Sequence, residues 1–283
     1  VTIVFLIILT ITVVAPLITI LIDSFRVSTV GESATINLPL GKLTGKHWYG
    51  VLFDSEYDYA VNAFWKPLGN SIGMSLVACL VAVLGGGVTA WFVTRSNLPC
   101  KKFISTVFVF PYVMPSWSIA MFWENFFKNT NLTTATKQVG MLQMITGGAE
   151  RGLCVPQWMV YGFLPTAMCL GIHYAPFAYI LIGGILRNMD ANLEEAATVL
   201  KAGRAKILWR VTLPIVAPAL ISTILLVFSS SISSYTVPAF LNRDGSFATI
   251  STQMRSVAGN PNTRGQGYVI AIILLLFSVA ILS

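Results

Sequence analysis

A charged stretch between residues 192 and 214 has the pattern of two short helices, a candidate surface for contact with a partner protein. Its first half predicts a helix with an apolar stripe at positions i, i+3, i+4 and i+7, which are Leu193, Ala196, Ala197 and Leu200. Asn192 is placed to cap this helix, and Glu195 at its third position completes the start signal. Because an apolar stripe has to be buried, it packs either against its own chain or in a groove on a soluble partner.

The second half of the stretch predicts another short helix, from about 204 to 211. Gly203 is expected to supply the turn between the two helices, since glycine tolerates the left-handed backbone that ends a helix. Pro214 marks the start of the next apolar run, because proline suits the first turn of a helix. One alternative stays open: the elbow is an ordinary interfacial helix whose charges face water and lipid headgroups.

Polar side chains inside apolar runs are the other candidates for binding, since an ionisable group in a membrane is costly and usually functional. Glu124 falls at the outer end of one run, where it either reaches water or contacts a solute. His173 falls nearer the middle of another run, as a hydrogen-bonded structural residue or as a ligand. The hydroxyl-rich run 229–235 either faces a pathway or bonds back to its own helix.

Catalytic and metal-binding patterns are absent from the sequence. It contains no HExxH, no GxSxG and no phosphate-binding loop, and its two histidines lie far apart. No catalytic residue, no metal site and no cofactor bound by this chain is therefore predicted. The four cysteines form no CxxC pair and are interpreted as small buried apolar residues.

The composition places the elements that carry these residues in a membrane. Of the 283 residues, 55% are hydrophobic and only 10% are charged, and the mean hydropathy is +0.75. A soluble domain carries about a quarter charged residues, so lipid rather than water is the expected solvent. The net charge of +7 does not indicate a nucleic-acid partner, because the basic residues are dispersed among apolar runs and form no basic face.

Continuous apolarity predicts a single all-α, polytopic module over residues 1–283 with six transmembrane helices. The expected spans are roughly 2–22, 68–94, 103–127, 158–186, 214–240 and 268–283. The last span is cut short by the chain end, so a fragment of a longer chain is expected. Prolines within or beside the spans predict either plain kinks or broken helices that line a pathway.

Basic residues predict which ends of the spans face the cytoplasm. Segments 95–102 and 187–213 hold eight of the 18 basic residues within a small share of the chain. By the positive-inside rule these segments are cytoplasmic, and so are both termini of the module. The elbow at 192–214 is therefore expected on the cytoplasmic side.

The sequence Glu195-Ala196-Ala197, followed by Val211, Leu213 and Pro214, resembles the EAA loop of binding-protein-dependent ABC importer permeases. The resemblance implies a type I ABC importer permease fold in which this loop is the coupling helix that docks in a cleft of the ATPase subunit. The family pattern usually has glycine six residues after the glutamate, where this chain has Lys201, so the elbow is expected to turn slightly differently. The residues that the resemblance implies in ATPase coupling are Glu195, Ala196, Ala197, Leu200, Gly203, Leu213 and Pro214.

Two further segments, 234–241 and 247–254, resemble the ferric-iron branch of these permeases, which is related to branches for phosphonates, thiamine and polyamines. In the ferric branch two six-span modules are often fused in one chain. In the related permeases the fifth span lines the translocation route. The candidates for lining that route here are Ser230, Ser233 and Tyr235, with Tyr179 of the fourth span.

The resemblance also implies partners, a location and a mechanism. The partners are an ATP-binding subunit that carries ATP and Mg, an extracytoplasmic substrate-binding protein, and a second permease module, fused or separate. The chain would be a multi-pass protein of the bacterial inner membrane that works by alternating access and hydrolyses nothing itself. The rival interpretation is an ion-coupled secondary transporter or channel, which would depend on intramembrane carboxylates or inverted repeats, neither of which is evident.

Overall fold

The computed structural model describes residues 2–132, 138–189, 197–199, 201–243, 245 and 247–282. Within these ranges the chain is helical, with no strand and with one isolated bridge between Arg26 and Leu43. The helices divide into two compact units, Val1–Ile72 with Phe247–Ser283, and Gly73–Ser246. The predicted all-α, polytopic fold is confirmed.

Four helical segments in the described chain are long and apolar enough to cross a membrane. They overlap the predicted spans at 68–94, 158–186, 214–240 and 268–283, and their bounds are Val61–Arg95, Gln157–Asn188, Leu208–Ile232 and Arg264–Leu282. The predicted span 214–240 is too long at its end, because the helix stops at Ile232 and a separate short helix begins at Thr236. Helices α5 (Lys101–Val113) and α6 (Ser116–Phe127) meet the same criteria only as a bent pair, and α1 (Thr2–Ser24) provides a shorter apolar helix, Ile8–Ser24. The count of six spans stays a prediction.

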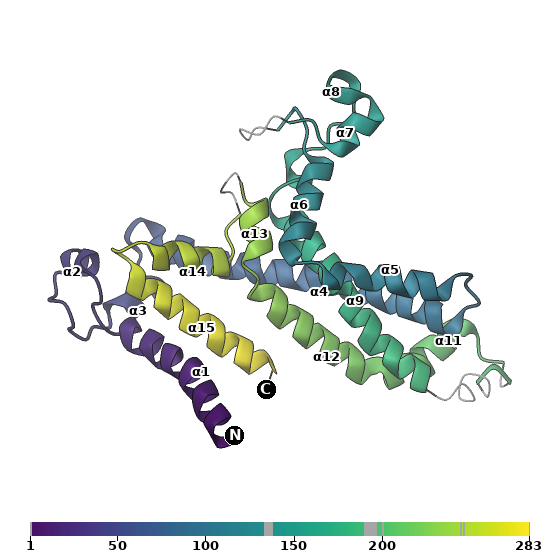
Figure 1. The fold of residues 1–283 in the computed structure, drawn as a ribbon, viewed down its shortest axis with the longest axis horizontal. Coiled ribbons are helices and arrows are strands. Elements are labelled where there is room, and N and C mark those ends of the chain that lie inside the picture. The colour runs from purple at the N-terminus through teal and green to yellow at the C-terminus, as the bar shows by residue number, and fades with distance from the viewer. Residues whose placement is uncertain are drawn as a thin grey trace. The chain divides into compact units, whose positions relative to one another are not determined.

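The first unit brings together segments from both ends of the described chain. Helix α15 (Arg264–Leu282) packs against α1, as Figure 1 shows, and also against α14 (Ile250–Gly259) and α3 (Lys46–Leu52). The remaining elements of this unit are α2 (Val30–Ile36), η1 (Glu56–Asp58), the π-helical turn η2 (Val61–Trp65) and the first residues of α4 (Lys66–Arg95).

A buried carboxylate joins α2 to the start of α15. Glu32 is fully buried, forms a capping box with Thr29, and accepts hydrogen bonds from the backbone N–H groups of Ser28, at 2.8 Å, and of Gly265. The ring of His47 lies against Gly265, where an added Cβ atom would come within 2.7 Å of it. Burial lowers the pKa of His47, and the nearby Glu32 carboxylate opposes that shift only in part. A neutral imidazole therefore fills this corner at pH 7.

The second unit is centred on α9 (Phe163–Asn188). This helix packs against α5 (Lys101–Val113), α6 (Ser116–Phe127), α12 (Leu213–Ile232) and α13 (Thr236–Leu241). Its core includes one buried cluster from α4, α9 and α12, made of Ala90, Val93, Ala178, Tyr179, Ile182, Leu186 and Val216. The shorter elements are α7 (Met141–Thr146), α8 (Gly148–Arg151), η3 (Gln157–Met159), α11 (Arg204–Ile207) and the π-helical turn η4 (Leu208–Thr212).

The predicted span 103–127 consists of two helices, α5 and α6, that meet at an angle of 101°. Proline explains the break, because Pro115 has no N–H and disfavours helical backbone in the residue before it. Met114 accordingly is extended, with φ −74° and ψ 143°, and ends α5. A single continuous helix over this range is therefore wrong, and the break lies where the prolines predict one.

Close packing between α4 and α9 depends on a small residue. A Cβ atom added at Gly86 would lie 2.3 Å from the carbonyl oxygen of Ala175 and 2.6 Å from the side chain of Ala178. Backbone atoms cannot yield as a flexible side chain can. The two helices can approach this closely only while position 86 has no side chain.

The change Gly86→Ala is expected to destabilise the second unit by about 1–3 kcal/mol, because the added methyl group overpacks the contact between the helices. The matched control is Gly184→Ala on α9, where nothing lies within 4 Å of the new methyl group. Thermal unfolding of the purified protein in detergent measures both. The apparent Tm should fall for the first variant and not for the second, and equal values would contradict the close contact.

Candidate functional site

The elbow predicted at 192–214 is described in part. Residues 197–199 are helical, and α11 and η4 continue without a break into α12, so the second predicted short helix forms the first turns of a longer one. Within the apolar stripe the described member is Ala197, which is half-buried. The candidates that lie outside the described residues are Glu195, Ala196 and Leu200, together with Asn192 and Leu193.

The turn of the elbow is made by Lys201. Its backbone is left-handed, with φ 58°. Its N–H donates to the carbonyl of Thr198 at 2.9 Å, and the N–H of Ala202 donates to the carbonyl of Ala197 at 3.0 Å, which together form a Schellman helix end. The predicted turn at Gly203 is wrong, because that glycine lies outside the left-handed region and instead accepts the first bond of α11. The left-handed residue is thus at the position where the EAA pattern usually has glycine.

Leu213 and Pro214 stand at the start of α12, as predicted. Leu213 is half-buried, Pro214 is exposed, and the N–H of Leu213 closes the π-turn by bonding to the carbonyl of Leu208. The π-turn η2 likewise ends just before a proline, Pro67. Such local widening is one way in which a membrane helix accommodates a residue that cannot donate a hydrogen bond.

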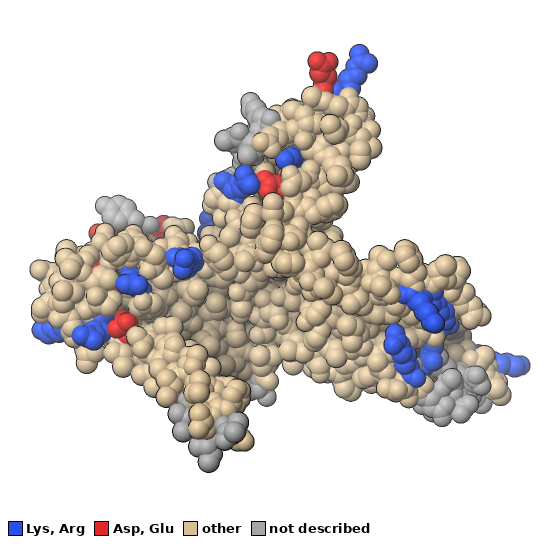
Figure 2. Space-filling model, in the orientation of Figure 1, with Lys and Arg blue, Asp and Glu red and all other residues tan. Residues whose placement is uncertain are grey.

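Two large apolar side chains near the elbow are exposed, Val199 at 81% and Trp209 at 68%. Sequence reasoning missed them, because the periodic stripe lies on other positions of the first short helix. Their size and their place within the stretch 192–214 are the signals that could have indicated them. Figure 2 shows Lys and Arg, with no Asp or Glu among the coloured side chains in view, at the end of the second unit that carries α11 and the start of α5.

The four pathway candidates do not gather in one place. Tyr179 is buried at 4% exposure, and its hydroxyl donates to Ser105 of α5 at 2.8 Å. It shares a cluster with Val216, fourteen residues before Ser230 on α12, which corresponds to about 21 Å of helix. The other candidates are exposed around the end of α12 and the start of α13, and they are Ser230, Ser233 and Tyr235. The role of all four stays a prediction.

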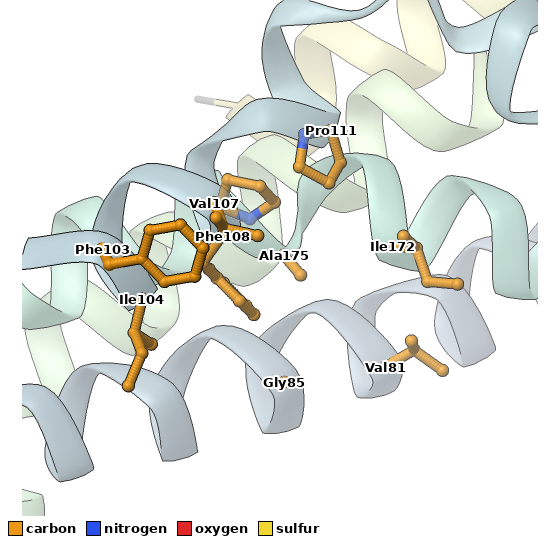
Figure 3. A pocket seen from close by; sticks show the side chains of 10 residues that line it. Val81, Gly85, Phe103, Ile104, Val107, Phe108, Pro111, Ile172 and Ala175 are labelled. Carbon is orange, nitrogen blue, oxygen red and sulfur yellow. The ribbon is translucent and has the colours of Figure 1, made fainter. Parts of the chain in front are cut away.

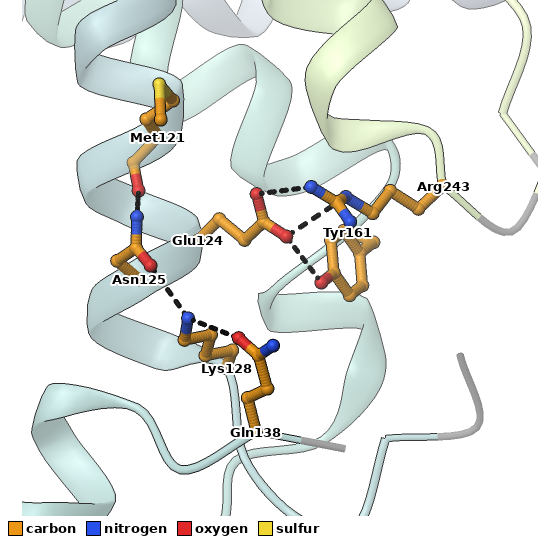
Figure 4. A network of polar contacts seen from close by, with 7 residues as sticks. All are labelled: Met121, Glu124, Asn125, Lys128, Gln138, Tyr161 and Arg243. Atoms are coloured by element: carbon orange, nitrogen blue, oxygen red, sulfur yellow. Dashed lines mark hydrogen bonds and ion pairs between the residues drawn. The ribbon is translucent and has the colours of Figure 1, made fainter. Parts of the chain in front are cut away.

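Glu124 is held in an ion pair and does not extend to water (Figure 4). Its side chain is 9% exposed, and its Oε1 atom lies 3.0 Å from Nε of Arg243 and accepts from the Tyr161 hydroxyl at 2.9 Å. Nη2 of Arg243 donates to Oε2 at 3.3 Å. These three residues come from α6, from the segment after α13 and from the segment before α9. Removing one partner of such a pair leaves an uncompensated buried charge, so the group fixes these segments together.

His173 supports the broken helix. Its Nδ1 atom lies 3.0 Å from the carbonyl oxygen of Pro111, and its ring stacks on Tyr112 at 5.9 Å between centroids. In a continuous helix that carbonyl would accept from residue 115, but Pro115 has no N–H. An imidazole protonated at Nδ1 supplies the missing donor. The contact supports the structural alternative for His173 over a ligand role.

A cavity of about 400 Å³ between α4, α5 and α9 is apolar throughout (Figure 3). Its lining includes Val81, Phe103, Phe108 and Ile172. A cavity without polar groups accepts an apolar chain but cannot orient a polar solute. Within the described ranges, no three His, Cys, Asp or Glu side chains are grouped so that they could hold a metal ion.

The cysteines fit their predicted role in part. Cys79 and Cys169 are buried within the second unit, as expected for small apolar residues. Cys154 is half-buried and Cys100 is exposed, which differs from the prediction, because both lie in segments between the long helices.

Comparison with known proteins indicates one family. Residues 82–283 match the family described as binding-protein-dependent transport system inner membrane component. A putative ferric transport system permease protein of Haemophilus influenzae is 26% identical over 220 residues, which cover 76% of this chain and 32% of that protein. A putrescine transport system permease protein of Escherichia coli is 25% identical over 232 residues, which cover 82% of this chain and 70% of that protein. The chain thus spans about a third of the length of the ferric relatives.

A solved structure gives the same fold. The bacterial ABC transporter that imports the acidic polysaccharide alginate superposes with a TM-score of 0.67 at 15% sequence identity, covering 98% of this chain and 89% of that chain. At this identity the likeness extends to the fold and not to the solute.

The change Lys201→Gly is expected to stabilise the end of the first elbow helix by about 1 kcal/mol, because glycine adopts a left-handed backbone without the steric cost of a Cβ atom. Hydrogen–deuterium exchange of the amides at 201 and 202 should become slower. Gly203→Ala is the control, and it should leave that exchange unchanged. Equal exchange in the wild type and in Lys201→Gly would contradict the turn at 201.

The change His173→Leu is expected to destabilise the protein by about 1–3 kcal/mol, because the carbonyl of Pro111 is left without a donor. In a Pro115→Ala background the same change should cost less, since residue 115 regains an N–H that can reach that carbonyl. A double-mutant cycle on the unfolding free energy in detergent measures the coupling. Strictly additive effects would show that His173 does not serve this carbonyl.

Proposed function

Because the chain belongs to the family of binding-protein-dependent transport system inner membrane components, we propose that it is the permease subunit of an ATP-driven solute importer. The long apolar helices fit a multi-pass protein of the inner membrane. Its contribution is a pathway and not a reaction, and a partner subunit binds ATP and Mg and hydrolyses the nucleotide.

The observation that carries the proposal is the elbow. A short helix ends at Lys201 in a Schellman turn, and the next helix leads directly into α12. A displacement of the elbow would therefore be transmitted to a long apolar helix. Exposed Val199 and Trp209 leave apolar surface of the elbow uncovered. A cleft on the ATP-binding subunit would cover this surface, with Glu195, Ala196, Ala197 and Leu200 as the docking residues.

Two further partners complete the proposed importer. An extracytoplasmic binding protein would deliver the solute at the opposite membrane face, which agrees with the family description. A second permease module, fused or separate, would enclose the pathway together with this one. Nucleotide binding on the cytoplasmic face would then switch the access of that pathway from one side to the other.

Ferric iron is the solute that we propose for this importer. Support comes from segments 234–241 and 247–254 and from the ferric permease relatives of Haemophilus influenzae and Actinobacillus pleuropneumoniae, each 26% identical. Relatives named for sulfate and putrescine transport are 25% identical, so uptake assays should include these solutes as well.

The rival, an ion-coupled carrier, needs a carboxylate in the membrane that can take up and release an ion. Among described residues of the second unit, Glu124 is the one carboxylate within an apolar helix, and it is bound to Arg243 and Tyr161. This pairing favours the importer.

The changes Glu195→Lys and Ala197→Trp are each expected to abolish ATP-dependent uptake, because one reverses a docking charge and the other fills the docking face. Membrane insertion should be unchanged, and co-purification with the ATP-binding subunit should be lost. The control is Glu56→Lys, the same charge reversal at an exposed residue of η1, which should transport normally. Normal uptake with either elbow variant would count against the coupling role.

A further inference from the structure

A second cavity of the second unit, about 530 Å³ in volume, differs from the apolar one because polar side chains form part of its lining. It lies between α5 and α9, beside Phe110 and Ile180. The polar side chains that line it are Ser105, Thr106, Tyr179 and Arg187.

The hydrogen bonds along this cavity run in one direction. Arg187 donates from Nη2 to the hydroxyl oxygen of Tyr179 at 3.3 Å, and Tyr179 donates to Oγ of Ser105 at 2.8 Å. Ser105 in turn donates to the carbonyl of Lys101 at 2.8 Å. Both hydroxyl protons are thus engaged, whereas a guanidinium carries five N–H donors and only one of them is used on Tyr179. The group can therefore offer a solute donors and positive charge.

The position of the guanidinium is informative. Arg187 is in the last turn of α9, and Tyr179 lies eight residues earlier, about 12 Å along the helix axis. An arginine near the end of a span ordinarily extends outward to the headgroups, whereas this one reaches back toward the middle of the helix. Arg187 is nevertheless an exposed residue, so its guanidinium remains accessible to a solute.

No free carboxylate balances this charge in the described spans of the second unit. Between residues 73 and 189 the sequence has two acidic residues, Glu124 and Glu150. Glu124 is paired with Arg243, and Glu150 lies in α8, outside the apolar helices, whereas Asp190, three residues after Arg187, lies outside the described residues. Since like charges repel, a bare ferric ion or a polyamine would be disfavoured beside Arg187.

We propose that this cavity is a station on the translocation route and that it selects an anionic solute whose oxygens bind the Arg187 guanidinium. The solute is either a free oxyanion or a ferric ion carried as an anionic chelate, and the two share the same oxygen chemistry. The inference rests on the proposed importer function and names the charge class of its cargo.

The test uses the complete importer, with its ATP-binding subunit and its binding protein, reconstituted in liposomes. Three radiolabelled probes are compared: ferric citrate, sulfate and putrescine. Uptake of one of the first two is expected, and which of the two it is separates chelate from oxyanion. Uptake of putrescine alone would overturn the proposal.

The variant Arg187→Gln should lower uptake of the anionic probe about tenfold or more, the size expected for a lost charge-assisted bond. Arg187→Lys should recover much of it, and Tyr179→Phe, which keeps the ring against Phe108, should raise KM more than it lowers the maximal rate. The control is Lys102→Gln, an exposed basic residue of α5. Wild-type uptake of the anion by Arg187→Gln would overturn the proposal.

Two readouts separate failure of the cavity from failure of the importer. ATPase activity and co-purification with the ATP-binding subunit should be normal in Arg187→Gln, since the elbow is untouched. If the wild type itself neither binds an ATPase nor takes up any probe with ATP, the proposed function fails and the charge selection falls with it.

Discussion

The bilayer core has no water for an unpaired backbone group, and this chain nevertheless places prolines in the helices that would cross it. Each proline removes a donor, so another part of the chain has to supply one or the helix has to change its turn. Both solutions occur. His173 of α9 lies within bonding distance of the Pro111 carbonyl, and the π-turns η2 and η4 precede Pro67 and Pro214. The bend between α5 and α6 consequently depends on α9, which packs against both helices.

The same constraint governs the charges of the second unit. Glu124 is buried and is paired with the partly exposed cation Arg243 and with a hydroxyl donor, which leaves that site nearly neutral. Arg187 is bonded to the hydroxyl of Tyr179, which accepts a hydrogen bond but does not cancel the charge. The buried carboxylate therefore serves to hold segments together, whereas the exposed guanidinium of Arg187 keeps a positive potential beside a cavity. That difference is the physical basis for assigning structure to the first and solute binding to the second.

The elbow is less tightly specified than the helices it joins. A lysine in the left-handed region costs free energy that a glycine would not, and Thr198, Val199 and Gly203 near it are exposed. Val199 and Trp209 are exposed, so only a contact beyond the described residues could bury them. A segment of this kind fits a coupling role, because binding of a partner can supply the stability that the elbow itself lacks.

Apolarity and local periodicity are properties of single segments, and the features that depend on them could be predicted from the sequence. These are the membrane class, the all-α fold, the approximate bounds of the long helices, the break near Pro115 and the existence of the elbow. Tertiary structure decided the angle of the break, the partner of Glu124 and the donor for Pro111, because those contacts join residues 119 and 62 positions apart. It also decided that Lys201 rather than Gly203 makes the turn. The N–H groups of Lys201 and Ala202 bond to the last carbonyls of the preceding helix, and this geometry requires the left-handed residue at position 201. Local sequence contains no information on which helices come to lie side by side, and that arrangement is what makes one polar residue a ligand candidate and another a structural bond.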